Sequence, residues 1–138
     1  MIVIESSREI NIRDVIKRSP VSHLPGAEEV LRECLYRSVH VRYGLVDGEV
    51  ACVWGLIPPT LLSTTAYLWL LTTEIIAEHK FLFVRYSQLY VQEALKSFPC
   101  IIGDCIVGER SAMRWLRWLG AEFAEPIDGR IPFVIRKK

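Results

Sequence analysis

The stretch from Cys100 to Phe123 (CIIGDCIVGERSAMRWLRWLGAEF) restricts the fold more than any other part of the chain. It opens with Cys100–Val107, a short and mostly apolar run that is typical of a strand buried on both faces. Apolar residues then recur at three- and four-residue spacing, which places them on one face of a helix: Ala112, Trp115, Leu116 and Leu119. Gly120 ends this helix as a residue that accepts a left-handed cap, and Ala121–Phe123 resumes an extended pattern. The stretch therefore predicts a strand, a helix, a glycine and a second strand in succession.

The composition fits one globular domain that spans residues 1–138. The chain is 51% hydrophobic and 24% charged, and its formal net charge is +1. A charge this small gives no support for binding nucleic acid through a large electrostatic field. The apolar window Ala66–Leu71 is too short to cross a bilayer, and the N-terminus has charges by position 5 and no long apolar run. We therefore expect a cytoplasmic protein with neither a membrane segment nor a signal peptide.

The cysteines and histidines do not predict a metal site. The chain has 4 cysteines, at positions 34, 52, 100 and 105, and none pairs with another at a C-x-x-C spacing. The 3 histidines, at positions 23, 40 and 79, do not cluster with them. Each cysteine lies in an apolar run, where a free thiol packs as a small hydrophobic group. We therefore expect reduced core cysteines and no bound metal.

The rest of the chain alternates between helix-like and strand-like patterns. The predicted elements are, in chain order, a strand at Ile2–Ile4, a helix that carries Ile10–Ile16 and is capped by Ser6 or Ser7, a helix at Ala27–Arg37, strands at Val39–Val46, Val50–Ile57 and Ala66–Thr72, a helix at Glu78–Phe98 and a last strand at Ile131–Ile135. Asp47-Gly48 joins two of these strands in a tight hairpin, because both residues accept the positive φ angles of a type I′ turn. This order predicts an α+β fold, an α/β/α sandwich with a mixed, mostly antiparallel sheet of about 6–7 strands and about four helices.

Two segments in this order resemble the GNAT N-acetyltransferases. Arg110–Phe123 (RSAMRWLRWLGAEF) is similar to the fourth conserved segment of that superfamily, in which an alanine-bearing helix ends in a glycine followed by a strand. Val46–Ala51 (VDGEVA) resembles its hairpin between the second and third strands. The resemblance covers nearly the whole chain and implies transfer of an acyl group from acetyl-CoA or another acyl-CoA to an amine. It also implies a glycine-rich loop that grips the cofactor pyrophosphate at the start of the helix after the central strand.

The chain departs from that superfamily at positions that matter for catalysis. The stretch equivalent to the glycine-rich loop, Thr72–Leu82, contains no glycine, so side chains would crowd an anion at the helix start. Counting back from Gly120, Leu116 stands where the superfamily usually has a tyrosine general acid, and leucine cannot protonate a leaving thiolate. Glu109 stands where it usually has an asparagine. These departures predict a degenerate acyl-CoA site on a retained fold.

A narrower resemblance agrees with these departures. The small internal virion proteins of T7-like podophages look like degenerate members of the same fold. They carry a similar helix-Gly-Ala-x-Phe segment, then a turn with Asp-Gly (Asp128-Gly129 here) and a last strand. The similarity is strongest over the C-terminal third of the chain. It implies a phage-encoded protein that is packaged in the virion or acts in the host cell cytoplasm.

Several candidate site residues follow the predicted central strand. Glu74 could accept a proton from an incoming amine, or it could be a loop carboxylate in water. His79 and Lys80 could bind a cofactor phosphate at the start of the helix, or they could simply be exposed, because their spacing matches no phosphate motif. The residues at the strand end complete the predicted cofactor-binding set on this segment: Leu71, Thr72 and Thr73.

Two further candidates, Gly103 and Asp104, stand inside the apolar run Cys100–Val107. A carboxylate in such a run must be paired, must shift its pKa or must lie where the strands part. In the superfamily that the chain resembles, the strands part near here to admit the cofactor, so Asp104 is the second catalytic candidate. Structural pairing of Asp104 is the alternative. Gly103 fits a bulge or a close backbone approach and joins the predicted cofactor-binding residues.

The predicted last helix carries Arg110, Arg114 and Arg117 at i, i+4 and i+7, with Trp118 on the same side. These residues could contact a protein partner, with Trp118 as an anchor, or they could form a solvated face. Two classes of function therefore stay open. One is a coenzyme-A-dependent N-acyltransferase, and the other is a non-catalytic interaction protein on the same scaffold, such as a virion component or a host-directed factor. The two differ in whether a cofactor groove persists near Thr72 and Gly103.

Overall fold

A computed structural model gives the fold of the chain and describes residues 2–5, 12–19, 25–60, 62–106 and 110–137. Its elements are, in chain order, β1 (Ile2–Glu5), α1 (Ile12–Lys17), α2 (Ala27–Arg37), β2 (His40–Val46), β3 (Glu49–Ile57), β4 (Thr65–Thr72), the 3₁₀ helix η2 (Glu74–Glu78), α3 (Lys80–Ser97), β5 (Cys100–Ile106), α4 (Arg110–Trp118), β6 (Glu122–Phe123) and β7 (Arg130–Arg136). This order agrees with the prediction, and η2 is an addition to it. The predicted cap at Ser6 or Ser7, Gly108 and Glu109 lie outside the described residues.

The strands follow the order β1-β2-β3-β4-β5-β7-β6. The pairs β1/β2, β2/β3, β5/β7 and β6/β7 are antiparallel, and β4 pairs with β5 in parallel. A parallel pair needs a crossover connection, and here η2 and α3 supply it between β4 and β5. The predicted α+β fold with a mixed, mostly antiparallel sheet is therefore confirmed.

The chain divides into two compact units that share two elements. Unit 1 comprises residues 1–57 and 69–83, and unit 2 comprises residues 58–68 and 84–138. The strand β4 and the helix α3 each contribute residues to both units. The single domain expected from the chain length stays a prediction.

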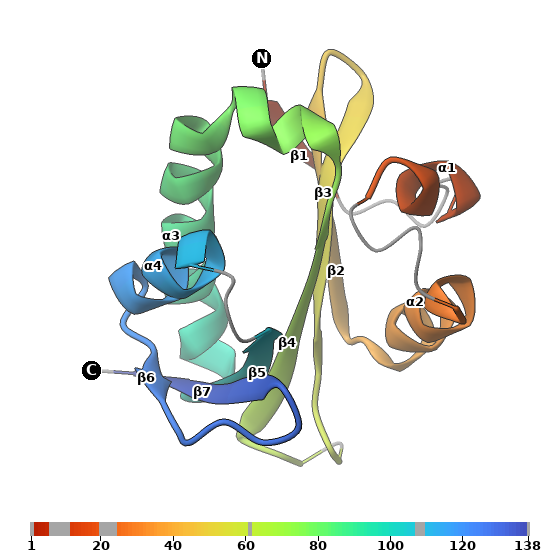
Figure 1. Cartoon of the computed structure of the whole chain (residues 1–138). Helices are drawn as coiled ribbons and strands as arrows, with labels where there is room; N and C mark the ends of the chain where they lie inside the picture. The colour runs from red at the N-terminus through yellow and green to blue at the C-terminus, as the bar shows by residue number, and fades with distance from the viewer. Residues whose placement is uncertain (1, 6–11, 20–24, 61, 107–109, 138) are drawn as a thin grey trace. The chain divides into compact units, whose positions relative to one another are not determined.

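Unit 1 is built on the β2–β3 hairpin. Asp47 and Gly48 have φ angles of 51° and 82°, as a type I′ turn requires, so the predicted hairpin is confirmed. Figure 1 shows α1 and α2 side by side next to β2 and β3. Val53 and Leu56 of β3 are almost fully buried and form part of the core.

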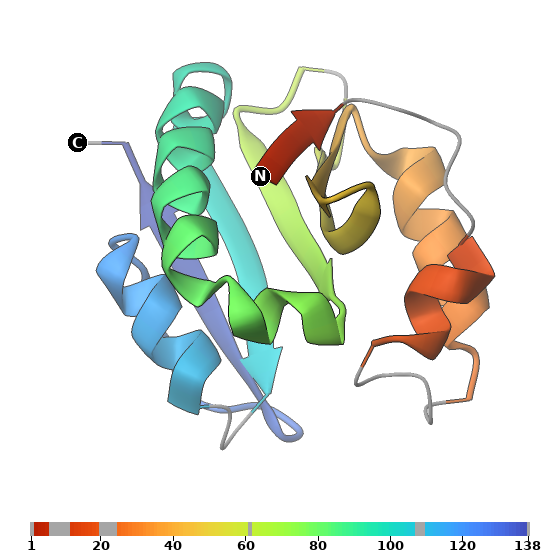
Figure 2. The same cartoon turned by 90° about the horizontal axis from the view of Figure 1, so that it is seen from above.

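Unit 2 is built on the antiparallel pair β5/β7. Ile101 of β5 and Ile135 of β7 are paired and almost fully buried. Figures 1 and 2 show α3 and α4 side by side along these strands. The indole N–H of Trp115 on α4 donates a 2.8 Å hydrogen bond to the Ser87 hydroxyl oxygen on α3. Gly120 has a φ of 96°, which confirms the predicted left-handed end of α4.

A hydrogen-bonded chain in unit 1 requires glycine at position 55. The indole N–H of Trp69 donates to the Ser38 hydroxyl oxygen at 2.7 Å, and that hydroxyl donates to the Cys34 carbonyl at 2.6 Å. A Cβ on Gly55 would lie 2.7 Å from the Trp69 indole nitrogen and 2.8 Å from both the Ser38 Oγ and the His40 carbonyl oxygen. The absence of a side chain at this position therefore lets β4 and the end of α2 meet over β3.

We predict that Gly55→Ala lowers the free energy of unfolding by about 1–3 kcal/mol, because one of the atoms in the way is a backbone carbonyl that cannot rotate aside. Urea denaturation followed by circular dichroism measures the loss. Ser38→Ala, which removes the hydrogen bonds without adding a methyl group, is the comparison. An unchanged denaturation midpoint for Gly55→Ala would contradict this account of the packing.

Candidate functional site

The first part of the candidate site is the turn between β4 and α3, residues 73–79, where the resemblance places the glycine-rich loop. The last β4 residues before it, Leu71 and Thr72, are half-buried. Thr73 then precedes η2, and α3 begins at Lys80. The turn thus contains a short 3₁₀ helix of sequence EIIAE in place of glycines.

Thr73 fixes this turn to β3. It is 3% exposed, its backbone N–H donates to the Ala51 carbonyl at 2.9 Å, and its hydroxyl donates to the Val50 carbonyl at 2.8 Å. Two residues later Ile75 is buried in a cluster with Val46 and Ala51. The N–H and the hydroxyl of Thr73, which was predicted to bind the cofactor, are therefore both bonded to β3.

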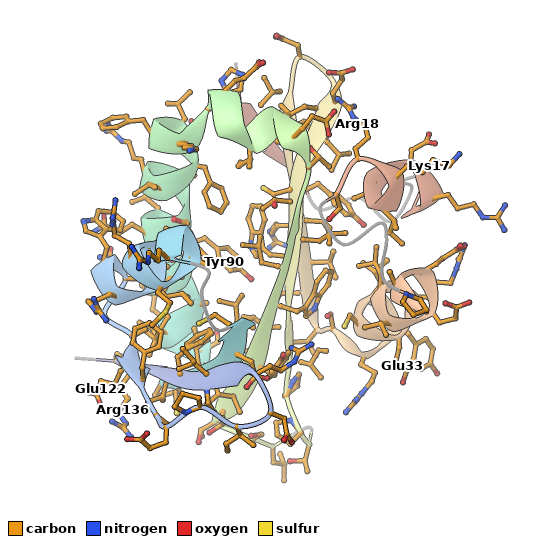
Figure 3. All side chains as sticks on the ribbon, in the orientation of Figure 1. Lys17, Arg18, Glu33, Tyr90, Glu122 and Arg136 are labelled. Carbon is orange, nitrogen blue, oxygen red and sulfur yellow. The ribbon has the colours of Figure 1, made fainter. Side chains whose placement is uncertain are left out.

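Glu74, the predicted general base, forms an ion pair with Arg18 at the end of α1. The Arg18 Nε lies 2.6 Å from Glu74 Oε1, and Arg18 Nη1 lies 3.6 Å from Oε1 of Glu49. The backbone joins the same contact, since the Glu74 N–H donates to the Arg18 carbonyl at 3.2 Å. The hydrogen bond from Arg18 lowers the pKa of Glu74, which makes its carboxylate a weaker base. Figure 3 labels Arg18 at the end of α1.

His79 and Lys80 lie at the start of α3. The Phe83 N–H donates to the His79 carbonyl at 3.0 Å, so His79 caps the helix. The first turn of α3 contains no acidic residue, and the side chain of Lys80 is exposed. The first N–H groups of a helix have no partner within it, so the helix dipole makes this end positive.

The turn as a whole does not fit the pyrophosphate of acyl-CoA in the way that the resemblance implies. A phosphate cradle needs several backbone N–H groups that point at the ligand. In residues 73–79, four of these groups already donate to backbone carbonyls of the chain. The donors and acceptors are Thr73 to Ala51, Glu74 to Arg18, Ile76 to Thr73 and His79 to Ile76. The exposed carboxylates of Glu74 and Glu78 add negative charge to the same turn.

The second part of the candidate site lies in unit 2, on β5. A Cβ on Gly103 would lie 2.5 Å from the ring carbon Cζ of Phe133, its partner on β7, and 3.1 Å from the Leu68 carbonyl oxygen on β4. Phe133 is 6% exposed. The close approach that the sequence predicted at Gly103 is therefore made by a phenyl ring of the chain itself.

Asp104 lies on the opposite, exposed face of β5 from Gly103. The Tyr67 hydroxyl on β4 donates to Asp104 Oδ2 at 3.3 Å. The next residue, Cys105, is buried, and burial together with the Asp104 charge raises the pKa of its thiol. The sequence left a catalytic role and structural pairing open for Asp104, and the structure supplies Tyr67 as a partner for the pairing alternative.

The last position to place is Leu116, where the superfamily usually has a tyrosine acid. Leu116 is 3% exposed and packs in the core of unit 2, and its carbonyl accepts the Ala121 N–H.

Among the described residues, no group of three or more His, Cys, Asp and Glu side chains could hold a metal ion. The cysteines are free thiols, and burial raises the pKa of Cys52 to about 12. In the described parts of the chain, no helix is both long enough and apolar enough to cross a bilayer.

Comparisons with known proteins give a result at the level of structure only. No protein-family model matches the chain, and no curated protein matches its sequence. Solved acetyltransferase structures match it over its full length. One is an acetyltransferase from Bacillus subtilis in complex with CoA, at 12% identity, with 100% of both chains covered and a TM-score of 0.76. Another is the ribosomal-protein-S18-alanine N-acetyltransferase from Escherichia coli, at 14% identity, with 99% of this chain and 94% of that chain covered and a TM-score of 0.76.

A third match is an acetyltransferase assigned to the GNAT family from Desulfovibrio desulfuricans, at 13% identity, with 99% of both chains covered and a TM-score of 0.72. The fold is that of the GNAT acetyltransferases. The predicted resemblance to that superfamily is confirmed for the fold.

On this GNAT fold, the residue that sequence reasoning missed is Arg18. It lies 56 positions before Glu74, and no local pattern connects the two. Phe133, which covers Gly103, was equally hidden, although the order of strands would have suggested a β7 neighbour for β5.

The Arg18–Glu74 pair predicts a pH-dependent stability. Because the pKa of Glu74 is lower in the folded chain than its ordinary value of 4.5, its ionised form stabilises the fold above that value. The stabilisation disappears as the pH falls through the lower, folded pKa. Glu74→Gln should therefore melt below the wild type at neutral pH, and the gap should close once the pH has fallen below the folded pKa of Glu74. Thermal melts of Glu78→Gln, an exposed glutamate of the same turn, provide the control, and a gap between wild type and Glu74→Gln that persists in acid would refute the ion-pair role.

The contact of Gly103 with Phe133 predicts a coupled pair of substitutions. Gly103→Ala should cost about 1–3 kcal/mol of unfolding free energy, because the new methyl group overlaps the ring. Phe133→Leu shortens the side chain, so the double variant should lose less than the sum of the single losses by about 0.5 kcal/mol or more. Urea denaturation of the four proteins measures the coupling. Full stability of Gly103→Ala would contradict this packing, because it would show that the Phe133 ring moves aside without cost.

Proposed function

We propose that this chain keeps the acetyltransferase scaffold but does not bind acyl-CoA, and that it acts as a non-catalytic binding protein. The observation that carries the proposal is the closed turn at residues 73–79, in which the N–H groups of Thr73, Glu74, Ile76 and His79 donate to the chain itself. Positive φ angles and bare backbone are what glycine supplies to a phosphate loop, and this turn has neither.

Two further observations support the same conclusion. Leu116 is a core residue with no proton to give to a leaving thiolate. Glu74 is paired with Arg18, which lowers the pKa of this carboxylate just after β4. A general base works best with a pKa near the working pH, so this shift runs in the unhelpful direction.

A second candidate function is a residual acyltransferase that moves an acyl group from acyl-CoA to an amine. One observation favours it: α3 starts with the exposed Lys80 and has no acid in its first turn, so its N-terminus is electrostatically suited to a phosphate group. In that case Glu74 or Asp104 would have to accept the proton of the amine. The acetyl-CoA titration below distinguishes the two candidates.

The narrower resemblance to the internal virion proteins of T7-like podophages is part of the proposal. A binding protein of phage origin would act in the virion or in the host cytoplasm, where an acetyltransferase scaffold can serve without catalysis. The fold alone does not establish an activity, because one scaffold supports many functions.

Calorimetric titration with acetyl-CoA tests the proposal. The wild-type chain should give no binding heat at millimolar acetyl-CoA, because the turn offers too few N–H groups. Lys80→Glu tests the start of α3, and Lys17→Glu, an exposed lysine on α1 with the same change of charge, is its control. Micromolar binding that weakens about tenfold or more in Lys80→Glu, but not in Lys17→Glu, would overturn the proposal in favour of the residual acyltransferase.

A further inference from the structure

The helix α4 presents a compact basic surface in unit 2. Arg110, Arg114 and Arg117 are exposed and recur at i, i+4 and i+7, so they share one side of the helix. Trp118 follows beside them and is 51% exposed, whereas Trp54 and Trp69 are 7% and 8% exposed. We call these four α4 residues the arginine–tryptophan face.

Within the parts of the chain that the structure describes, the three arginines of this face have no carboxylate partner. Among the described residues, no Asp or Glu oxygen lies within the 4.0 Å limit of an ion pair with any of them. Arg13, Arg18, Arg32 and Arg136 do pair with glutamates, Arg136 with Glu122 at 2.8 Å, both labelled in Figure 3. An ordinary solvated helix face intersperses charges of both signs, and this one does not.

Two local features favour a bound anion at the face. Arg110 is the first residue of α4, and the first turn contains no acidic residue, so the side chain and the positive end of the helix dipole repel each other. The guanidinium of Arg117 lies 5.6 Å from the centre of the Phe123 ring. Stacking on a ring fixes a guanidinium and leaves the donors on its edge free for a carboxylate. An anion bound here would reduce the repulsion between Arg110 and the helix dipole, and it would accept hydrogen bonds from the free donors of Arg117.

We propose that the arginine–tryptophan face docks a short acidic segment of a protein partner. Arginine binds carboxylates through two parallel hydrogen bonds, and tryptophan and arginine are the residues that most often dominate protein interfaces. Trp118 supplies the apolar anchor, and the three guanidinium groups select carboxylates at matching helical spacing.

The charge of the rest of the chain decides between an acidic protein segment and a nucleic acid. The chain has 17 Lys and Arg against 16 Asp and Glu, so without these three arginines 14 positive charges face 16 negative ones, a net charge of −2. In the sequence of unit 2, the 6 Lys and Arg outside this face are balanced by 6 Asp and Glu, so a long polyanion that runs past the face would gain no further net attraction there. A short acidic segment needs only the face itself, and it therefore fits better.

This proposal extends the proposed function by naming the class of partner. It does not depend on the turn at residues 73–79, and the acetyl-CoA titration can fail or succeed without affecting it.

Fluorescence anisotropy with the full chain tests the docking face. The probe is a fluorescein-labelled helical peptide of about 14 residues that carries glutamates at i, i+4 and i+7 beside one leucine. A peptide of the same composition in scrambled order and a poly-dT oligonucleotide of equal charge are the comparison ligands. The helical peptide should bind more tightly than both, and its affinity should fall as salt is added.

Variants locate the binding. Arg114→Glu should weaken peptide binding about tenfold or more, and Trp118→Ala about threefold or more. Arg85→Glu, an exposed arginine of α3 with the same change of charge, should leave the affinity unchanged. Circular dichroism checks that each variant is folded, and Arg114→Gln replaces Arg114→Glu if the latter is not. Because Trp118 is much more exposed than Trp54 and Trp69, the bound peptide should also protect part of the tryptophan fluorescence from acrylamide.

Three results would overturn the proposal. The first is no binding of the helical peptide by the wild type. The second is an equal loss of affinity in Arg114→Glu and Arg85→Glu, which would show general charge attraction. The third is tighter binding of the poly-dT oligonucleotide than of the peptide, which would assign the face to nucleic acid.

Discussion

The chain leaves β4 through a residue that is bonded twice to β3, and the character of the candidate site depends on this contact. Thr73 donates its backbone N–H to Ala51 and its hydroxyl to Val50, and it is buried as it does so. A buried N–H or hydroxyl without a partner is costly, so these bonds hold the first residue of the turn in one orientation. Ile75 then enters the cluster of Val46 and Ala51, which determines the path of the backbone into η2. The turn is therefore organised by contacts within unit 1 and needs no ligand to order it.

An anion-binding loop has the opposite design. Its backbone N–H groups must stay unbonded within the chain, which is tolerable only if water or a ligand satisfies them. In a 3₁₀ helix the N–H groups are used by i→i+3 bonds, as those of Ile76 and His79 are here. The same backbone cannot serve both purposes. The internal bonding of η2 therefore explains why a chain of this fold can lack glycine in the turn and still be well ordered.

Much of the fold could be predicted from the sequence, because its signals are local. The periodicity of α4 and its terminal Gly120, the Asp47-Gly48 turn and the apolar strands each depend on neighbours a few residues away. The alternation of β5 could even have placed Asp104 correctly, since Ile101, Gly103 and Cys105 are buried and Asp104 between them is exposed.

The site was harder to predict, because its contacts are long-range. Arg18 reaches Glu74 across 56 positions, and Phe133 fills the space over Gly103 through the β5/β7 pairing. A single sequence shows a carboxylate at Glu74 and a glycine at Gly103, but it does not show which distant residue contacts each of them. Within unit 1, Arg18 supplies a charge beside Glu74, and within unit 2, Phe133 supplies a surface against Gly103. The groups around Glu74 and around Gly103 thus meet their polar and steric requirements within the chain, whereas the three arginines of α4 have no carboxylate partner among the described residues. Like charges on one helix face destabilise it, and a partner of the kind proposed above would supply the carboxylates that relieve this repulsion.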